Sequence, residues 1–98
     1  MVSGEKSAIQ ARCFLVRGRV QGVGYRDSML MEATRLGITG WVRNRKDGTV
    51  EAMVHGWADD VAQILNWARR GPSGAHVTAM NVNDSSGGYE IFERRPSG

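Results

Sequence analysis

The sequence predicts an α+β sandwich, in which an antiparallel sheet carries two helices on one of its faces. Its 98 residues are enough for one domain with a single modest core. Apolar runs and helical periods follow one another in the order β-α-β-β-α-β, with a further short β segment at the end. An Asp-Gly pair at residues 47–48 indicates a hairpin between the second and third strands. With right-handed crossovers, this order gives the ferredoxin-like arrangement.

The domain is expected over residues 11–94, between a flexible N-terminal tail over residues 1–10 and a C-terminal tail over residues 95–98. The first ten residues are small, polar and charged, with no periodic pattern, which is typical of a loose chain end. The first strand is predicted over residues 11–17, where a short apolar run ends at a glycine.

Two amphipathic segments predict the helices, over residues 27–36 and 59–70. Gly37 is expected to end the first helix as a left-handed cap, and Gly71-Pro72 to stop the second. The apolar stripes expected to be buried contain Tyr25, Met29, Ala33 and Leu36 in the first helix, and Val61, Ile64, Leu65 and Ala68 in the second.

The remaining strands are predicted over residues 38–44, 49–54 and 77–82, with a short edge strand over 89–93. Residues 45–48 are predicted to form the hairpin turn. Strict alternation in the fourth strand places Val77 and Ala79 on one face and Thr78, Met80 and Val82 on the other.

Composition and charge narrow the classes of function. The net charge of +3 is too small, and the basic residues too dispersed, to predict nucleic-acid binding. No apolar run is long enough to span a membrane. A single cysteine, Cys13, cannot form an internal disulfide and fits a cytoplasmic protein. His55 and His76 are too far apart in the sequence to indicate a metal cluster.

The segment around which the predicted site is organised is Gly18-Arg19-Val20-Gln21-Gly22-Val23-Gly24-Tyr25-Arg26. Its glycines allow several backbone N–H groups to turn inward at the positive end of a helix, where anions bind. Arg26 opposes the helix dipole, a cost of a few tenths of a kcal/mol, roughly, that an anion in the loop would offset. Arginine also grips phosphate with two parallel hydrogen bonds. From the loop alone, a plain glycine-rich turn followed by a solvated Arg26 explains the pattern about as well.

Two common phosphate-binding motifs do not fit this loop. A Walker loop ends in Gly-Lys-Ser/Thr, which the sequence lacks. The dinucleotide fingerprint Gly-x-Gly-x-x-Gly also fails, because Gly22-Val23-Gly24 is followed by Asp27 where the third glycine belongs.

Two motifs resemble the two signatures of the acylphosphatase family. The first is Gly18-x-Val20-Gln21-Gly22-Val23-x-Tyr25-Arg26, and the second is Gly40-Trp41-Val42-Arg43-Asn44 with Gly48, Val50 and Gly56 at the following spacings. The break at Gly71-Pro72 and the closing Gly88-Tyr89-Glu90-Ile91 also agree. The resemblance covers roughly residues 11–93, and two signatures in order are far more specific than one.

The resemblance implies hydrolysis of acyl phosphates to a carboxylate and inorganic phosphate by a monomer, without a metal or cofactor. In similar proteins, loop amides and an arginine hold the phosphoryl group, and an asparagine positions the attacking water. These roles fall here to the amides of Val20, Gln21, Gly22, Val23, Gly24 and Tyr25, to the side chain of Arg26, and to Asn44. In some similar proteins the chain stops soon after the last strand, and its carboxylate supports the active arginine.

The chemistry agrees with this set of residues. An acyl phosphate releases a carboxylate of pKa about 4, which departs without a proton, so no general acid is needed. The amide of Asn44 is no base near neutral pH, but its carbonyl oxygen can orient a water. Asp27, an exposed acid beside Arg26, can pair with that arginine and is assigned no chemistry.

Simpler and rival explanations remain open at this point. The local sequence alone favours Asn44 as a residue at the entry of a turn over a catalytic one, and the paired signatures reverse that preference. Trp41 is expected in the core. A non-catalytic module of the same fold could bind RNA on its sheet, using Phe14 and Trp41, although the RNA-recognition signature is absent. A regulatory domain could instead bind a phosphorylated small molecule without hydrolysing it.

Overall fold

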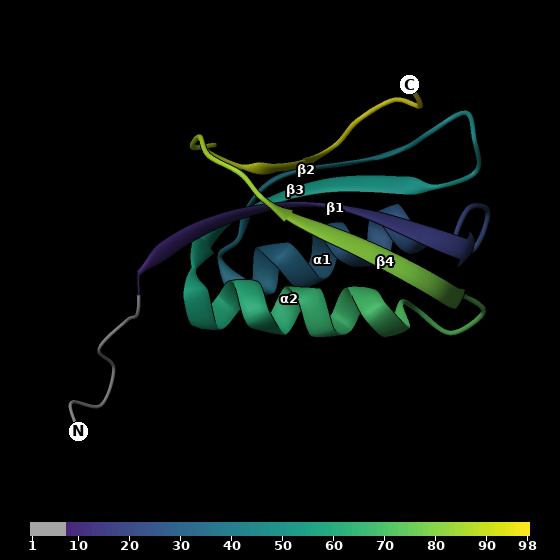
Figure 1. Cartoon of the computed structure of the whole chain (residues 1–98), viewed down its shortest axis with the longest axis horizontal. Helices are drawn as coiled ribbons and strands as arrows, with labels where there is room; N and C mark the ends of the chain where they lie inside the picture. Colours follow the sequence, from purple (N-terminus) through teal and green to yellow (C-terminus); the bar gives the residue numbers. More distant parts are fainter. Residues whose placement is uncertain (1–7) are drawn as a thin grey trace.

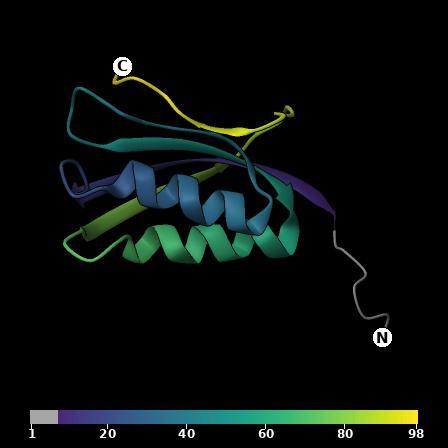
Figure 2. The ribbon, with the colours of Figure 1, turned by 180° about the vertical axis from the view of Figure 1, so that it is seen from behind.

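The structure is a computed structural model and describes residues 8–98 (Figure 1). Its elements are β1 (Ile9–Arg19), α1 (Tyr25–Leu36), β2 (Thr39–Asn44), β3 (Val50–Trp57), α2 (Ala58–Arg70), β4 (His76–Asp84) and β5 (Phe92–Arg94). The strands form one sheet in the order β4-β1-β3-β2-β5. Both helices cover the same face of this sheet (Figures 1 and 2). The predicted α+β sandwich is confirmed.

The sheet is mixed rather than purely antiparallel. Strand β1 pairs antiparallel with β3 and with β4, and β2 pairs antiparallel with β3. The added edge strand β5 pairs parallel with β2. The prediction of an edge strand over residues 89–93 was therefore right in kind, but the strand begins at Phe92 and ends at Arg94.

Residues 95–98, expected to be a tail, continue along β2. The N–H of Arg95 donates to the carbonyl oxygen of Val42 at 2.8 Å, and the N–H of Gly98 donates to that of Asn44 at 3.0 Å. These two bonds hold the C-terminal segment against the end of β2, where Asn44 lies.

Two strands are longer than predicted. Strand β1 begins at Ile9, inside the tail expected over residues 1–10, and β3 continues to Trp57 instead of ending at residue 54. Ile9 and Trp57 face each other in the β1–β3 ladder, so each strand extends the other. The rest of the expected N-terminal tail, residues 1–7, lies outside the described residues.

The face assignment in β4 was wrong at one position. Val77 packs against the same core as Met80 and Val82, although strict alternation puts it on the opposite face. The cause is a register shift beside Gly18, where the pairing with β1 passes over Thr78 and reverses the alternation.

The core lies between the sheet and the two helices, and the predicted stripes form its helical side. The stripe residues that are buried are Tyr25, Met29, Ala33, Val61, Ile64 and Ala68. Gly37 has a φ of 73° and is the expected left-handed cap of α1. Within residues 8–98, neither helix has the length and apolar character needed to cross a membrane.

Alternation in β2 decides where its functional side chain points. Val42 is fully buried in the core beneath the sheet. Asn44 lies two residues further along the strand and so shares that face, at the end where α1 begins. Trp41 lies on the opposite face and is only half-buried, so its predicted place in the core was wrong.

Candidate active site

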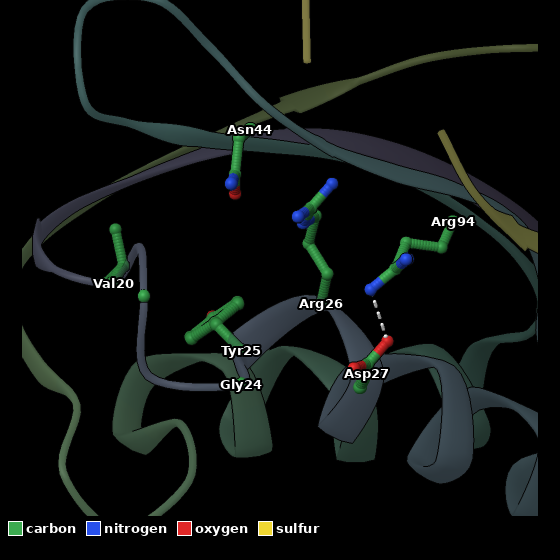
Figure 3. Close-up of a pocket in the computed structure, with 8 residues that line it drawn as sticks. Val20, Gly24, Tyr25, Arg26, Asp27, Asn44 and Arg94 are labelled. Atoms are coloured by element: carbon green, nitrogen blue, oxygen red, sulfur yellow. Dashed lines mark hydrogen bonds and ion pairs between the residues drawn. The ribbon is translucent and has the colours of Figure 1, made fainter. Parts of the chain in front are cut away.

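A pocket opens at one end of the sheet, where the loop after β1, the start of α1 and the end of β2 meet (Figure 3). The residues that line it are Val20, Gly22, Gly24, Tyr25, Arg26, Asp27, Asn44 and Arg94. The fold thus brings Arg26 and Asn44, from a helix and from a strand, to one cavity.

The glycines of the loop shape one wall of this pocket. Gly22 and Gly24 have φ values of 74° and 78°, in the left-handed region that glycine adopts without strain. A Cβ built on either glycine would meet no atom within 4 Å. Gly24 is also the N-cap of α1, and no side chain caps this helix end. The first amides of α1 are therefore left without a side-chain acceptor, at the end of the helix that attracts anions.

Two loop residues, Gln21 and Val23, are not among those that line the pocket. Val23 packs against the core. The side-chain nitrogen Nε2 of Gln21 donates to the carbonyl oxygens of Arg45, at 2.8 Å, and Thr49, at 2.9 Å. Sequence reasoning assigned Gln21 only a main-chain N–H and missed this bridge from the loop to the β2–β3 turn.

Tyr25 anchors the start of α1 against α2. Its side chain is 1% exposed, and its hydroxyl donates to the carbonyl oxygen of Ala68 at 2.7 Å. Its ring lies 5.3 Å from that of Trp67, centroid to centroid. Burial raises the pKa of the Tyr25 phenol well above its ordinary value, so it stays neutral at physiological pH. The side chain is thus a structural support beneath the pocket.

Arg26 extends from the first turn of α1 into the pocket, and in Figure 3 its guanidinium lies between Asn44 and Arg94. Its Nη1 donates to the backbone carbonyl oxygen of Arg95 at 3.3 Å. This bond uses one of the five N–H groups that a guanidinium carries. The C-terminal segment therefore contacts the predicted active arginine through a main-chain carbonyl group.

Arg94 is a pocket residue that sequence reasoning missed. Its Nη1 lies 2.8 Å from Oδ1 of Asp27, so Asp27 pairs with Arg94 rather than with Arg26. The two side chains are 46% and 66% exposed, at the rim of the pocket. The parallel pairing of Arg94 with Val42 brings it there, and no sequence signal marked that pairing.

The pocket is suited to binding an anion and poorly suited to acid–base chemistry. Its donors are a guanidinium, a carboxamide and helix-terminal amides, the groups that recognise phosphate oxygens. Asp27 is the single carboxylate among the lining residues described, and it is exposed and paired. Such a site can hold a phosphoryl group and orient a water, and it fits a reaction whose leaving group needs no proton.

Several known proteins are similar to this chain in sequence and in structure. A family model described as Acylphosphatase matches residues 12–93. The acylphosphatase of Thiobacillus denitrificans is 51% identical over 80 residues, which are 82% of this chain and 90% of the relative. The solved structure of an acylphosphatase from Coxiella burnetii has a TM-score of 0.85 at 33% identity, covering 89% of this chain and 93% of that one. The acylphosphatase of Bacillus subtilis has a TM-score of 0.83 at 34% identity, covering 90% and 99%.

Proposed function

The chain belongs to the acylphosphatase family and is an acylphosphatase, and we propose that it hydrolyses acyl phosphates, without a metal ion, in the pocket between the 18–26 loop and Asn44. The observation that carries this proposal is the convergence of Arg26, Asn44 and the uncapped start of α1 on one cavity. Its substrate is an acyl phosphate, and its products are a carboxylate and inorganic phosphate.

The phosphoryl group is held by the loop and by Arg26. The main-chain N–H groups of the loop residues that line the pocket, Val20, Gly22, Gly24 and Tyr25, bind its oxygens, and the partial positive charge of the helix end attracts it. Arg26 adds a full positive charge and two parallel donors. Without a bound anion, a guanidinium in the first turn of a helix is unfavourable. Bound phosphate offsets the cost of placing Arg26 there.

Arg26 is held in position by the C-terminal segment. The carbonyl oxygen of Arg95 accepts one hydrogen bond from the guanidinium, and the N–H of Arg95 is itself fixed to Val42. This main-chain contact occupies the supporting role that a terminal carboxylate has in some similar proteins. It leaves the remaining donors of Arg26 for the substrate.

Asn44 orients the attacking water. Its side chain lies on the helix-facing side of β2 and lines the pocket with Arg26 (Figure 3). The carboxamide oxygen accepts a hydrogen from the water and so aims its lone pair at phosphorus. The new bond joins the water oxygen to phosphorus, the bond from phosphorus to the acyl oxygen breaks, and a proton of the water passes to a phosphate oxygen. Positioning and charge stabilisation are the main requirements of phosphoryl transfer.

We propose further that the enzyme works as a cytoplasmic monomer. Every group assigned above comes from a single chain, so a second copy adds nothing that the reaction needs. Cys13 is a free, half-buried thiol whose pKa is raised, mainly by burial and then by the nearby Glu51 carboxylate. A single cysteine that stays a free thiol suits a reducing compartment. Equilibrium sedimentation of the active protein tests the monomer directly.

The structure weakens the rival RNA-binding module. Phe14, one of the two aromatic residues that it requires on the sheet surface, is 1% exposed and belongs to the core. The other, Trp41, already has the guanidinium of Arg95 at 4.8 Å and that of Arg43 at 5.4 Å from its ring centroid. Stacking of bases needs free aromatic faces.

The test is hydrolysis of benzoyl phosphate in excess EDTA, combined with calorimetric titration of inorganic phosphate. The proposal expects saturable hydrolysis that EDTA leaves unchanged, with phosphate as a competitive inhibitor. Phosphate binding without hydrolysis would identify a sensor of phosphorylated molecules, and neither signal would identify a non-catalytic module.

A further inference from the structure

We propose that Arg94 forms a subsite for a second anionic group, carried on the acyl part of the substrate. The inference rests on the function proposed above and names the class of acyl phosphate that the pocket prefers. Arg94 and Asp27 line the pocket together with Arg26, and the function proposed above uses neither of them to hold phosphate or to position water. A second cation at the rim of a phosphate pocket can therefore bind an anionic group of its own.

The position of Arg94 suits the acyl side of the substrate. In the view of Figure 3, Arg26 stands between the glycine loop with Asn44 on one side and Arg94 on the other. A phosphoryl group in the loop already has Arg26 and the start of α1 as partners. The acyl group must leave this enclosure toward the open rim, where the Arg94 side chain is 46% exposed.

The contact with Asp27 makes Arg94 an exchangeable donor. Nη1 of Arg94 and Oδ1 of Asp27 are 2.8 Å apart, but both side chains are substantially hydrated. An ion pair in such a setting contributes little to stability, so it is easily broken. A carboxylate or phosphate on the substrate can replace Asp27 as the partner of Arg94, and Asp27, 66% exposed, then returns to water.

The backbone of Arg94 is fixed, so only its side chain has to move. Arg94 pairs with Val42 in the β2–β5 ladder, and the next residue, Arg95, donates its N–H to the Val42 carbonyl. A guanidinium on a rigid backbone loses less freedom on binding than one on a loose tail. The expected ligand is an oxyanion, either a carboxylate or a phosphate, on an acyl chain that leads away from the phosphoryl group.

The test compares kcat/KM for benzoyl phosphate, 4-carboxybenzoyl phosphate and 4-phosphonobenzoyl phosphate, which differ only in the distal group. For Arg94→Gln, kcat/KM for each charged substrate should fall about fivefold relative to benzoyl phosphate. Asp27→Asn should raise kcat/KM for the charged substrates relative to benzoyl phosphate, because it releases Arg94 from its ion pair. The carboxylate and phosphonate substrates together show which distal oxyanion is preferred.

Arg35→Gln is the matched control. Arg35 forms an exposed ion pair with Glu32 on the same helix as Asp27. Replacing Arg35 with glutamine changes the net charge by the same amount as Arg94→Gln. It lies about 12 Å further along α1, at ~1.5 Å per residue, and does not line the pocket. At 0.15 M ionic strength, its removal should leave the substrate ratio unchanged.

The outcomes separate this inference from the proposed function. If Arg94→Gln lowers kcat/KM for all three substrates equally, Arg94 serves the phosphoryl group, and the subsite is wrong. If Arg35→Gln shifts the ratio as much as Arg94→Gln, the effect is one of overall charge, and the subsite is again wrong. Should the wild type hydrolyse none of them, the proposed function fails. The subsite is then decided by the same ratio in calorimetric binding of benzoylphosphonate and its 4-carboxy derivative.

Discussion

Nε2 of Gln21 lies 2.8 Å from the carbonyl oxygen of Arg45, the residue that directly follows Asn44. A second bond, 2.9 Å long, joins the same nitrogen to the carbonyl oxygen of Thr49 on the other side of the turn. One side chain thus connects the phosphate loop with the end of the strand that carries Asn44. This bridge helps to fix the position of one half of the pocket relative to the other.

Replacing Gln21 with glutamate should uncouple the two halves in a pH-dependent way. At neutral pH, a carboxylate would face two carbonyl oxygens, so both bridging hydrogen bonds would be lost, at about 0.5–1.5 kcal/mol for each. The two carbonyl oxygens keep their main-chain donors, the N–H groups of Gly48 and Arg45. We expect kcat/KM to fall on the order of tenfold at pH 7.5. The same repulsion raises the pKa of the new carboxyl, so its neutral form, which can donate one bond, dominates below that pKa. Activity relative to wild type should therefore recover as the pH is lowered toward 5, and a ratio that does not vary with pH would count against the bridge.

Asn44→Ala should separate turnover from binding. Without the carboxamide, the water loses its orienting acceptor, while the loop and Arg26 still hold phosphate. We expect kcat to fall about 10²-fold, by analogy with the loss of one transition-state hydrogen-bonding group, and the inhibition constant for inorganic phosphate to stay within about twofold. Equal losses in both would make Asn44 a phosphate ligand instead.

The C-terminal segment should matter through its backbone rather than its side chains. A chain that ends at Arg94 with an amidated C-terminus, which adds no carboxylate near Arg26, loses the Arg95 carbonyl that accepts from Arg26. We expect its kcat/KM to fall about tenfold, as for the loss of one charge-assisted hydrogen bond. Arg95→Ala keeps that carbonyl and removes only contacts with Glu93 and Trp41, so it should retain nearly full activity. Circular dichroism confirms that both variants are folded. A fully active truncated chain would show that Arg26 needs no such support.

Position 40 of the second motif requires glycine for a structural reason, because a side chain there would collide with the backbone of β3. Its φ is 138°, and a Cβ there would lie 1.9 Å from the carbonyl oxygen of Met53. We expect Gly40→Ala to lower the free energy of unfolding in urea by about 3 kcal/mol or more, because backbone must move. Gly48→Ala is the comparison: its φ is 92°, but its Cβ would meet no atom within 4 Å. Its cost should be only about 1–2 kcal/mol, the strain of the left-handed backbone. Similar losses in both variants would show that the close contact with Met53 relaxes without cost.

Local patterns predicted the parts of the fold that depend on neighbouring residues. Helical spacing identified Met29 and Ala33 as buried, and the Asp-Gly pair identified the turn, in which the N–H of Gly48 donates to the carbonyl oxygen of Arg45 at 3.1 Å. These features follow from the period of a helix and from the conformational needs of a tight turn. Arg26 and Asn44 were singled out by their motifs, and the structure places both at one pocket.

The features that the sequence did not predict depend on contacts between segments that are distant in the chain. Parallel pairing with β2 brings Arg94 to the pocket, and nothing within residues 92–98 specifies that partner. Trp41 lies outside the core because Val42 is the residue of β2 that faces the helices, and an apolar side chain alone does not decide which face is covered. The Gln21 bridge spans 24 residues to Arg45, and a glutamine in a loop carries no local sign of such a contact.

The central claim is that Arg26 holds the phosphoryl group during hydrolysis, and the most direct test is the rate of benzoyl phosphate hydrolysis in EDTA by wild type, Arg26→Ala and Arg26→Lys. We expect the alanine variant to lose at least 10²–10³-fold in kcat/KM, roughly, as when one such donor is removed. The lysine variant should also be poor, because its ammonium group lacks the two parallel donors. An Arg26→Ala variant that is folded and hydrolyses benzoyl phosphate at nearly the wild-type rate would contradict the account.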